Sequence, residues 1–185
     1  MANWASVEYI IEGSKEDLKT IQNALENPEE TGKSDWIGDV LIKLGYSKEE
    51  LEKYSLRGSL VDVRDLLETD DHIAFWTEEA WGLSDFAVLL EDIFPDITIY
   101  WYIEEPGMAI YETNDSEKKY FPAKYIVTYY EDGEIMEYYY PESDEELFEL
   151  TSDLTNGEVT DFPSLEKFND NDSTYFIVND IMIIP

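Results

Sequence analysis

The chain has 185 residues and a formal net charge of −32 at pH 7, a balance that repels nucleic-acid phosphates and anionic membranes and favours attraction to basic proteins. It has no cysteine, which excludes disulfides, thiolate metal sites, iron–sulfur clusters and cysteine nucleophiles. With 43% hydrophobic residues and no apolar run near the length of a membrane span, we expect one folded, soluble, cytoplasmic protein.

The first third of the chain predicts one strand followed by helices. Apolar residues alternate with other residues over Ala5–Glu12, which indicates a strand. Ser14 is a suitable N-cap for the helical spacing of apolar residues that follows it. A second helix is expected over residues 36–44, and Ser47 with Glu50 forms a capping box for a short third helix.

The middle of the chain contains one ambiguous segment and then a clear alternation of elements. Residues 56–67 fit either a strand or a helical turn, and the sequence leaves both open. A strand over 73–81 and a helix over 84–94 follow. Strands over 97–104 and 108–113 come next, with a Pro-Gly pair between them.

Residues 125–140 predict a β-hairpin that is rich in tyrosine and acid. Asp132-Gly133 favours a two-residue type I′ turn, which would pair Tyr130 with Ile135. Extended along both strands, this register predicts a packing face of Tyr125, Val127, Tyr129, Met136, Tyr138 and Tyr140. It leaves as outward residues Tyr130, Glu137 and Tyr139.

The last third predicts helices and one more strand. Ser143 and Glu146 suggest a capping box at the start of a helix. Residues 163–168 suggest a helical turn, and residues 175–184 suggest a strand. The fold class is therefore α+β, with a mostly antiparallel sheet, helices packed on one face and a C-terminal hairpin-helix-strand extension.

Three short motifs occur in a characteristic order along the first two thirds of the chain. They are Met1-Ala2-Asn3-Trp4-Ala5-Ser6, Thr77-Glu78-Glu79-Ala80-Trp81-Gly82 and Glu104-Glu105-Pro106-Gly107-Met108-Ala109. Together they resemble the ferredoxin-like domain of the Api-like proteins, which occur on phages, plasmids and other mobile elements. The resemblance implies a βαββαβ sheet with helices on one side, but no activity. Position 5 is Ala where many relatives carry Cys, which argues against an essential thiol.

The resemblance also suggests how a single domain of residues 1–185 is organised. Its ferredoxin-like portion would cover residues 1–122. The remainder, residues 123–185, would form an acidic extension, because residues 125–185 contain 16 acids and one base.

Few residues are candidates for catalysis or metal binding. His72 is the only histidine, and no organised partner for it is identifiable. A small carboxylate-dependent hydrolase is the alternative function, and it requires His72, Glu78 and Glu104 to converge to within about 12 Å around a cleft. Asp170-Asn171-Asp172 lacks the glycine and glutamate that a calcium loop needs further on. We predict no cofactor and no metal.

The leading hypothesis is a non-enzymatic protein of a mobile element that binds a basic protein, such as a nucleic-acid-binding defence protein. A net charge of −32 over roughly 9,000 Å² gives about a third of the charge density of B-DNA, so nucleic-acid mimicry would need the acids gathered in a stripe. An accessory structural module with a merely acidic surface is a further alternative. The candidate partner-binding residues are Tyr130, Glu131, Glu134, Glu137, Tyr139, Asp144, Glu145 and Glu146.

Overall fold

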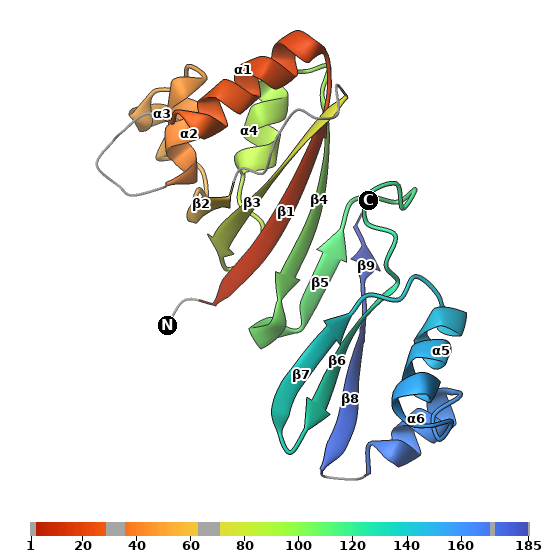
Figure 1. Ribbon diagram of the computed structural model, residues 1–185. Coiled ribbons are helices and arrows are strands. Elements are labelled where there is room, and N and C mark those ends of the chain that lie inside the picture. Colours follow the sequence, from red (N-terminus) through yellow and green to blue (C-terminus); the bar gives the residue numbers. More distant parts are fainter. Residues whose placement is uncertain (1–2, 29–35, 63–70, 171–172, 185) are drawn as a thin grey trace. The chain divides into compact units, whose positions relative to one another are not determined.

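The protein has an α+β architecture in a computed structural model that describes residues 3–28, 36–62, 71–170 and 173–184. The chain divides into two compact units, of which the first ends at Asp115 and the second spans Ser116–Ile184. Each unit has its own sheet, helices and hydrophobic core (Figure 1). None of the described helices combines the length and apolar character that crossing a bilayer requires.

The first unit is built on an antiparallel sheet. Its strands are β1 (Trp4–Glu12), β2 (Gly58–Asp62), β3 (His72–Ala80), β4 (Thr98–Glu105) and β5 (Ile110–Thr113). Its helices are α1 (Lys15–Glu26), α2 (Ile37–Lys43), α3 (Lys48–Leu51), α4 (Phe86–Ile93) and the 3-10 turn η1 (Pro106–Met108). The strands lie in the order β2-β3-β1-β4-β5, and each of these neighbouring pairs is antiparallel.

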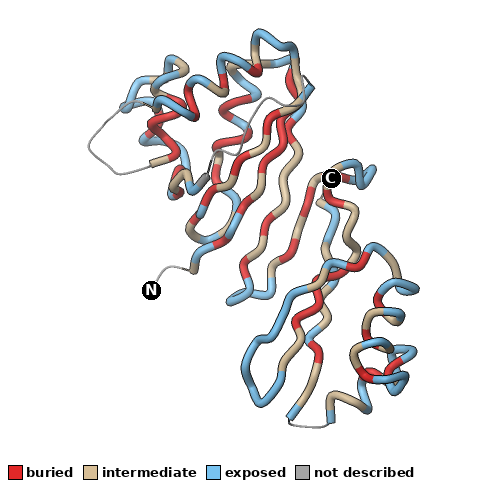
Figure 2. Tube along the Cα trace, in the orientation of Figure 1, coloured by how far each residue is buried: buried red, intermediate tan, exposed pale blue. Residues whose placement is uncertain are grey.

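Helices α1, α2 and α4 cover one face of this sheet (Figure 1). The alternation predicted for the first strand is confirmed, because every second residue of β1 from Ala5 to Ile11 is fully buried in the core (Figure 2). Tyr9 stacks on Phe75 with ring centroids 5.0 Å apart, and Phe86 meets both rings edge-on. The apolar stripe of each helix therefore closes directly over the apolar rows of the central strands.

Local sequence signals start the helices where they were predicted. The Ser14 hydroxyl accepts a hydrogen bond from the Asp17 amide at 3.2 Å, and Ser47 and Glu50 form the reciprocal capping box. Of the ambiguous residues 56–67, Gly58–Asp62 form strand β2. Residues 63–70 lie outside the described residues.

The second unit pairs a small sheet with two helices. The sheet consists of β6 (Tyr125–Glu131), β7 (Glu134–Tyr139) and β8 (Thr174–Asp180), and the helices are α5 (Asp144–Leu154) and α6 (Phe162–Phe168). The short strand β9 (Met182–Ile183) follows β8 in the chain and is not part of this sheet. The antiparallel order is β7-β6-β8. Leu147 of α5 and Leu165 of α6 pack with Val127 and Phe176 in a core on one face of this sheet. The single strand predicted over 175–184 is in fact two strands.

Candidate functional site

The β6–β7 hairpin begins with the predicted turn. Asp132 and Gly133 have φ angles of 49° and 82°, and both are positive, as a type I′ turn requires. Tyr130 pairs with Ile135 beside the turn, also as predicted. The Asp-Gly signal therefore fixes the turn and the first pairs of the hairpin.

A β-bulge then shifts the rest of the hairpin by one residue. Tyr129 pairs with Glu137, so Met136 is an extra residue in β7 and the predicted register is wrong from this point on. A slip of one residue exchanges the faces of every later side chain. Tyr139, predicted to point outward, packs against the core of the second unit. The predicted packing residues that are exposed instead are Met136, Tyr138 and Tyr140.

The face of this sheet opposite the core carries two adjoining rows of uncharged side chains near the hairpin. Cross-strand partners share a face, and the pairing gives the rows Ile135–Tyr130–Tyr175 and Tyr138–Thr128–Ile177. We call these six residues the open face. Ile135, Tyr138 and Ile177 are 48%, 45% and 42% exposed. An uncharged sheet face with three exposed apolar side chains is typical of an interaction surface.

Three tyrosines form the centre of the open face. The rings of Tyr130 and Tyr175 stack with centroids 4.6 Å apart and an interplanar angle of 9°. Burial, followed by the neighbouring phenols of Tyr175 and Tyr138, raises the pKa of Tyr130. The stacked rings of Tyr130 and Tyr175 therefore offer a rigid contact area at a small cost in side-chain entropy.

The hairpin tip beyond the open face is acidic. Glu131, Asp132 and Glu134 are exposed there, and the Glu131–Glu134 pair next to the turn projects from the core side of the sheet, as Tyr129 does. Tyr129, on the core side of β6, donates a hydrogen bond from its hydroxyl to the Glu131 carboxylate. This bond, followed by burial, raises the pKa of Tyr129 to about 12.

The raised pKa of Tyr129 predicts a loss of stability in alkali. The folded protein holds the phenolic proton up to a higher pH than the unfolded chain, so this contribution is complete below the ordinary pKa of about 10 and is lost as the pH rises to about 12. We expect urea midpoints of the wild type to fall between pH 10 and pH 12 more steeply than those of Tyr129→Phe. Equal slopes for the two proteins would contradict the assigned hydrogen bond.

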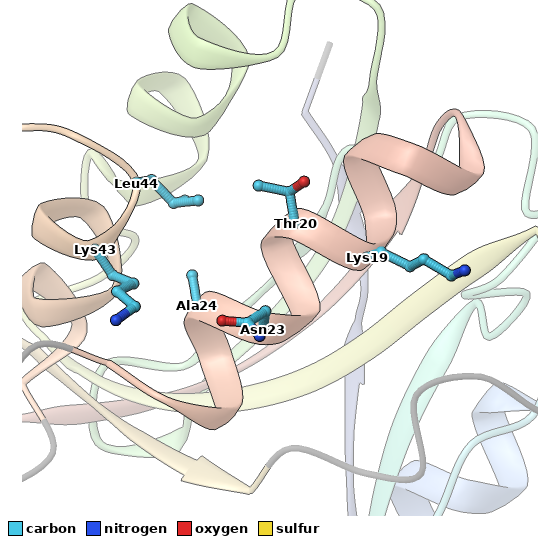
Figure 3. Close-up of a pocket in the computed structure, with 6 residues that line it drawn as sticks. All are labelled: Lys19, Thr20, Asn23, Ala24, Lys43 and Leu44. Atoms are coloured by element: carbon cyan, nitrogen blue, oxygen red, sulfur yellow. The ribbon is translucent and has the colours of Figure 1, made fainter.

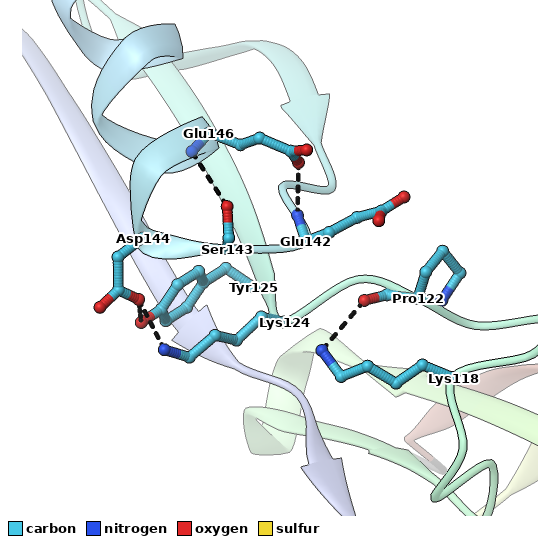
Figure 4. A network of polar contacts seen from close by, with 8 residues as sticks. All are labelled: Lys118, Pro122, Lys124, Tyr125, Glu142, Ser143, Asp144 and Glu146. Atoms are coloured by element: carbon cyan, nitrogen blue, oxygen red, sulfur yellow. Dashed lines mark hydrogen bonds and ion pairs between the residues drawn. The ribbon is translucent and has the colours of Figure 1, made fainter.

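The acids at the start of α5 have mainly structural roles. The Asp144 carboxylate accepts hydrogen bonds from Lys124 Nζ at 2.5 Å and from the Tyr125 hydroxyl at 2.7 Å, and Lys124 above all lowers the pKa of Asp144 (Figure 4). The Ser143 hydroxyl accepts from the Glu146 amide at 3.2 Å. The Glu146 carboxylate accepts from the amide of Glu142 at 2.8 Å, not from that of Ser143 as a capping box predicts.

The eight residues predicted as a partner surface therefore do not form one patch. Tyr130 lies on the open face, whereas Glu131 and Glu134 pair at the hairpin tip and project from the opposite, core side. Glu137 pairs with Tyr129 and so projects from the opposite, core side of β7, where it accepts a hydrogen bond from the Tyr139 hydroxyl at 2.8 Å. Asp144, Glu145 and Glu146 are exposed at the start of α5.

The three groups proposed for hydrolysis do not converge, because His72 lies far from the two carboxylates. Glu78 and Glu104 each pair with Ser6 and so are separated by strand β1, about 10 Å apart at the usual strand spacing. His72 lies at the far end of β3 from Glu78, about 20 Å away at roughly 3.3 Å per residue. Its ring nitrogen contacts Asp71 at 2.9 Å instead. The described residues thus contain no such catalytic group around His72.

Glu79 is a buried acid that sequence reasoning did not single out as structural. Its carboxylate accepts hydrogen bonds from the hydroxyls of Tyr9 and Thr77, each at 2.8 Å, and from the Ser84 amide. Burial, followed by the charge of Glu79, raises the pKa of Tyr9 well above its ordinary value. Glu79 therefore anchors the turn that leads into α4, while its neighbour Glu78 is exposed on the other face, as the strand alternation predicts.

Other concave sites in the first unit show no convergent chemistry. A shallow depression of about 350 Å³ lies between α1 and α2 (Figure 3). The ammonium groups of Lys19 and Lys43 lie at opposite sides of it and do not point toward each other, so they do not form an anion site. No group of three acidic or histidine side chains within the described ranges is arranged to hold a metal ion.

Comparison with protein-family models, with curated proteins and with solved structures finds no match for the chain. The resemblance to Api-like proteins therefore rests on its three sequence motifs alone. Any function has to be argued from the geometry of the open face and from the charge around it.

Proposed function

We propose that the chain is a non-enzymatic binding protein whose open face contacts a basic protein. The observation that supports this most directly is the uncharged open face, with Tyr138, Ile135 and Ile177 exposed, in a chain of net charge −32. Protein interfaces commonly have such an apolar, tyrosine-rich centre with a polar rim. Here the hairpin tip next to the open face is acidic, because Glu131, Asp132 and Glu134 are exposed at it.

The charge around the open face selects the kind of partner. The second unit contains 17 acidic and four basic residues between Ser116 and Ile184, a net charge of −13. A strongly acidic unit attracts a partner with Lys and Arg around an apolar centre and repels acidic surfaces. A second copy of the chain is disfavoured as the partner, because two molecules of net charge −32 repel each other.

We also propose that the first unit has a ferredoxin-like fold and derives from a mobile element. In chain order β1, α1, β2, β3, α4 and β4 follow a βαββαβ pattern, with α2 and α3 inserted before β2, and their strands lie in the order β2-β3-β1-β4. This order supports the ferredoxin-like assignment. A basic, nucleic-acid-binding defence protein is the partner class that suits both this origin and the acidic surface.

The binding proposal is tested by titrating the full-length, ¹⁵N-labelled chain with a 12-residue peptide of alternating arginine and leucine. We expect saturable amide shifts at the open face and an affinity that falls at higher salt. The double variant Tyr138→Ser/Ile177→Ser should bind at least tenfold more weakly, because central interface residues commonly contribute more than about 1 kcal/mol each.

Two controls separate binding at the open face from general attraction. Val88 and Met108 are exposed apolar residues of the first unit, and Val88→Ser/Met108→Ser should leave the affinity within about twofold of wild type. A peptide with serine in place of leucine keeps the charge and should bind much more weakly. Equal binding of both peptides, or equal affinities of the two double variants, would favour a merely acidic surface and refute the proposal.

A further inference from the structure

A groove lies between α6 and the strands β6 and β8, on the core side of the second sheet and away from the open face. Its volume is about 420 Å³, within the range of sites that hold small ligands. Tyr125, Leu165 and Phe176 belong to the core of the second unit and form its apolar wall. The groove is therefore a concave, preformed feature of one unit.

The charged residues that line this groove are both acidic. Glu166 of α6 and Asp180 of β8 line it and are exposed, and no lining residue is basic. Asn169 also lines it, but the Asn169 amide donates to the Phe176 carbonyl at 2.7 Å and accepts from the Phe176 amide at 2.9 Å. Its polar atoms therefore hold the wall together, and the groove presents two negative charges to a ligand.

Aromatic rings complete the groove and suit a cation. Phe162 lines the groove and is 47% exposed, with its ring edge-on to Tyr125 at a centroid distance of 6.4 Å. Tyr125 is 5% exposed and Lys124 Nζ already lies 4.9 Å from the centroid of its ring, so Phe162 is the ring that remains available to a cation from outside. Lys124 itself is held by Asp144 at 2.5 Å.

We propose that the groove between α6 and β8 binds an arginine side chain of the basic partner. A guanidinium group stacks flat on aromatic rings and forms paired hydrogen bonds with carboxylates, and the groove supplies the exposed ring of Phe162 for the first interaction and Glu166 and Asp180 for the second. A lysine ammonium is a strongly hydrated point charge and uses the rings less well. This inference rests on the proposed function, because the partner supplies the arginine.

The test uses N-acetyl-L-argininamide as a probe of the groove in the full-length ¹⁵N-labelled chain. We expect saturable amide shifts around Tyr125, Phe162 and Glu166, and none of comparable size with N-acetyl-L-citrullinamide, which has nearly the same shape but no charge. N-acetyl-L-lysinamide should bind at least threefold more weakly than the arginine compound. Shifts with the citrulline compound equal to those with the arginine compound, or shifts spread evenly over acids elsewhere, would overturn the proposal.

Isosteric variants show whether the two acids carry the binding. Glu166→Gln/Asp180→Asn should weaken the arginine compound at least fivefold, whereas Glu149→Gln on the exposed side of α5 should change the affinity less than twofold. If the arginine–leucine peptide still binds the open face while the arginine compound ignores the groove, this inference fails and the proposed function stands. If the compound fills the groove and the peptide does not bind the open face, the proposed function fails instead.

Discussion

Replacing Glu79 with alanine is expected to lower the free energy of unfolding of the first unit by about 4 kcal/mol. The carboxylate is fully buried, and the Tyr9 hydroxyl, the Thr77 hydroxyl and the Ser84 amide all donate to it. Alanine would leave these three donors in the interior with no acceptor, and each such group costs about 1–3 kcal/mol. Urea unfolding followed by tryptophan fluorescence measures the effect, because all five tryptophans lie in the first unit.

The neighbouring residue offers a matched control for this prediction. Glu78 is exposed on the other face of β3, so Glu78→Ala should change the stability by less than about 0.5 kcal/mol. Tyr9→Phe removes one donor and keeps the ring, and should cost about 1 kcal/mol. If Glu79→Ala proved no more destabilising than Glu78→Ala, the carboxylate would not be the anchor of the turn before α4.

The elements of the fold follow largely from short-range signals in the sequence. Alternating apolar residues predict β1 because a strand buried on one face needs every second side chain in the core. Ser14 and Ser47 predict helix starts because their hydroxyls satisfy backbone amides at the first turn. These signals act within a few residues, so they can be recognised without knowing the tertiary contacts of the chain.

The register of the second sheet could not be read in the same way. The Asp132-Gly133 turn determines only the pairs next to it, and no residue near Met136 indicates that Met136 is an extra residue in β7. The bulge turns Tyr139 toward Val127 and the core, and leaves Tyr138 exposed. Tyrosine suits either face because it has both an apolar ring and a polar hydroxyl. The residue types of β7 therefore do not indicate which of its tyrosines face the core.

The candidate site depended on this same long-range information. The sequence placed Tyr130 in the surface, but Tyr175 and Ile177 come from a strand more than 40 residues later along the chain. Only the antiparallel pairing of β6 with β8 puts them in the same rows. Likewise, Glu79 is buried because it contacts Tyr9 and the turn before α4. The sequence contains 44 acidic residues and gives no local sign of which of them are buried.

Replacing Phe176 with alanine is expected to unfold the second unit while the first unit stays folded. Phe176 is 2% exposed, and its ring lies 5.1 Å from that of Tyr129 and 5.7 Å from that of Phe168. A buried Phe→Ala change costs about 3–5 kcal/mol. A unit of about 70 residues rarely has more than about 3–5 kcal/mol of stability from a single core, so this loss is enough to unfold it.

Ile177 provides the control variant for this prediction, and the tryptophans report separately on the first unit. Ile177 follows Phe176 in β8 but lies on the open face. Ile177→Ala should therefore lower the free energy of unfolding of the second unit by less than about 1 kcal/mol. In Phe176→Ala, dispersed amide signals from residues 116–184 should collapse, while the urea midpoint reported by tryptophan fluorescence should stay at the wild-type value. A fall of that midpoint together with the amide signals would mean that the two units fold as one. If they are independent, the same variant should also lose binding of the arginine–leucine peptide, because the open face exists only when β6, β7 and β8 are paired.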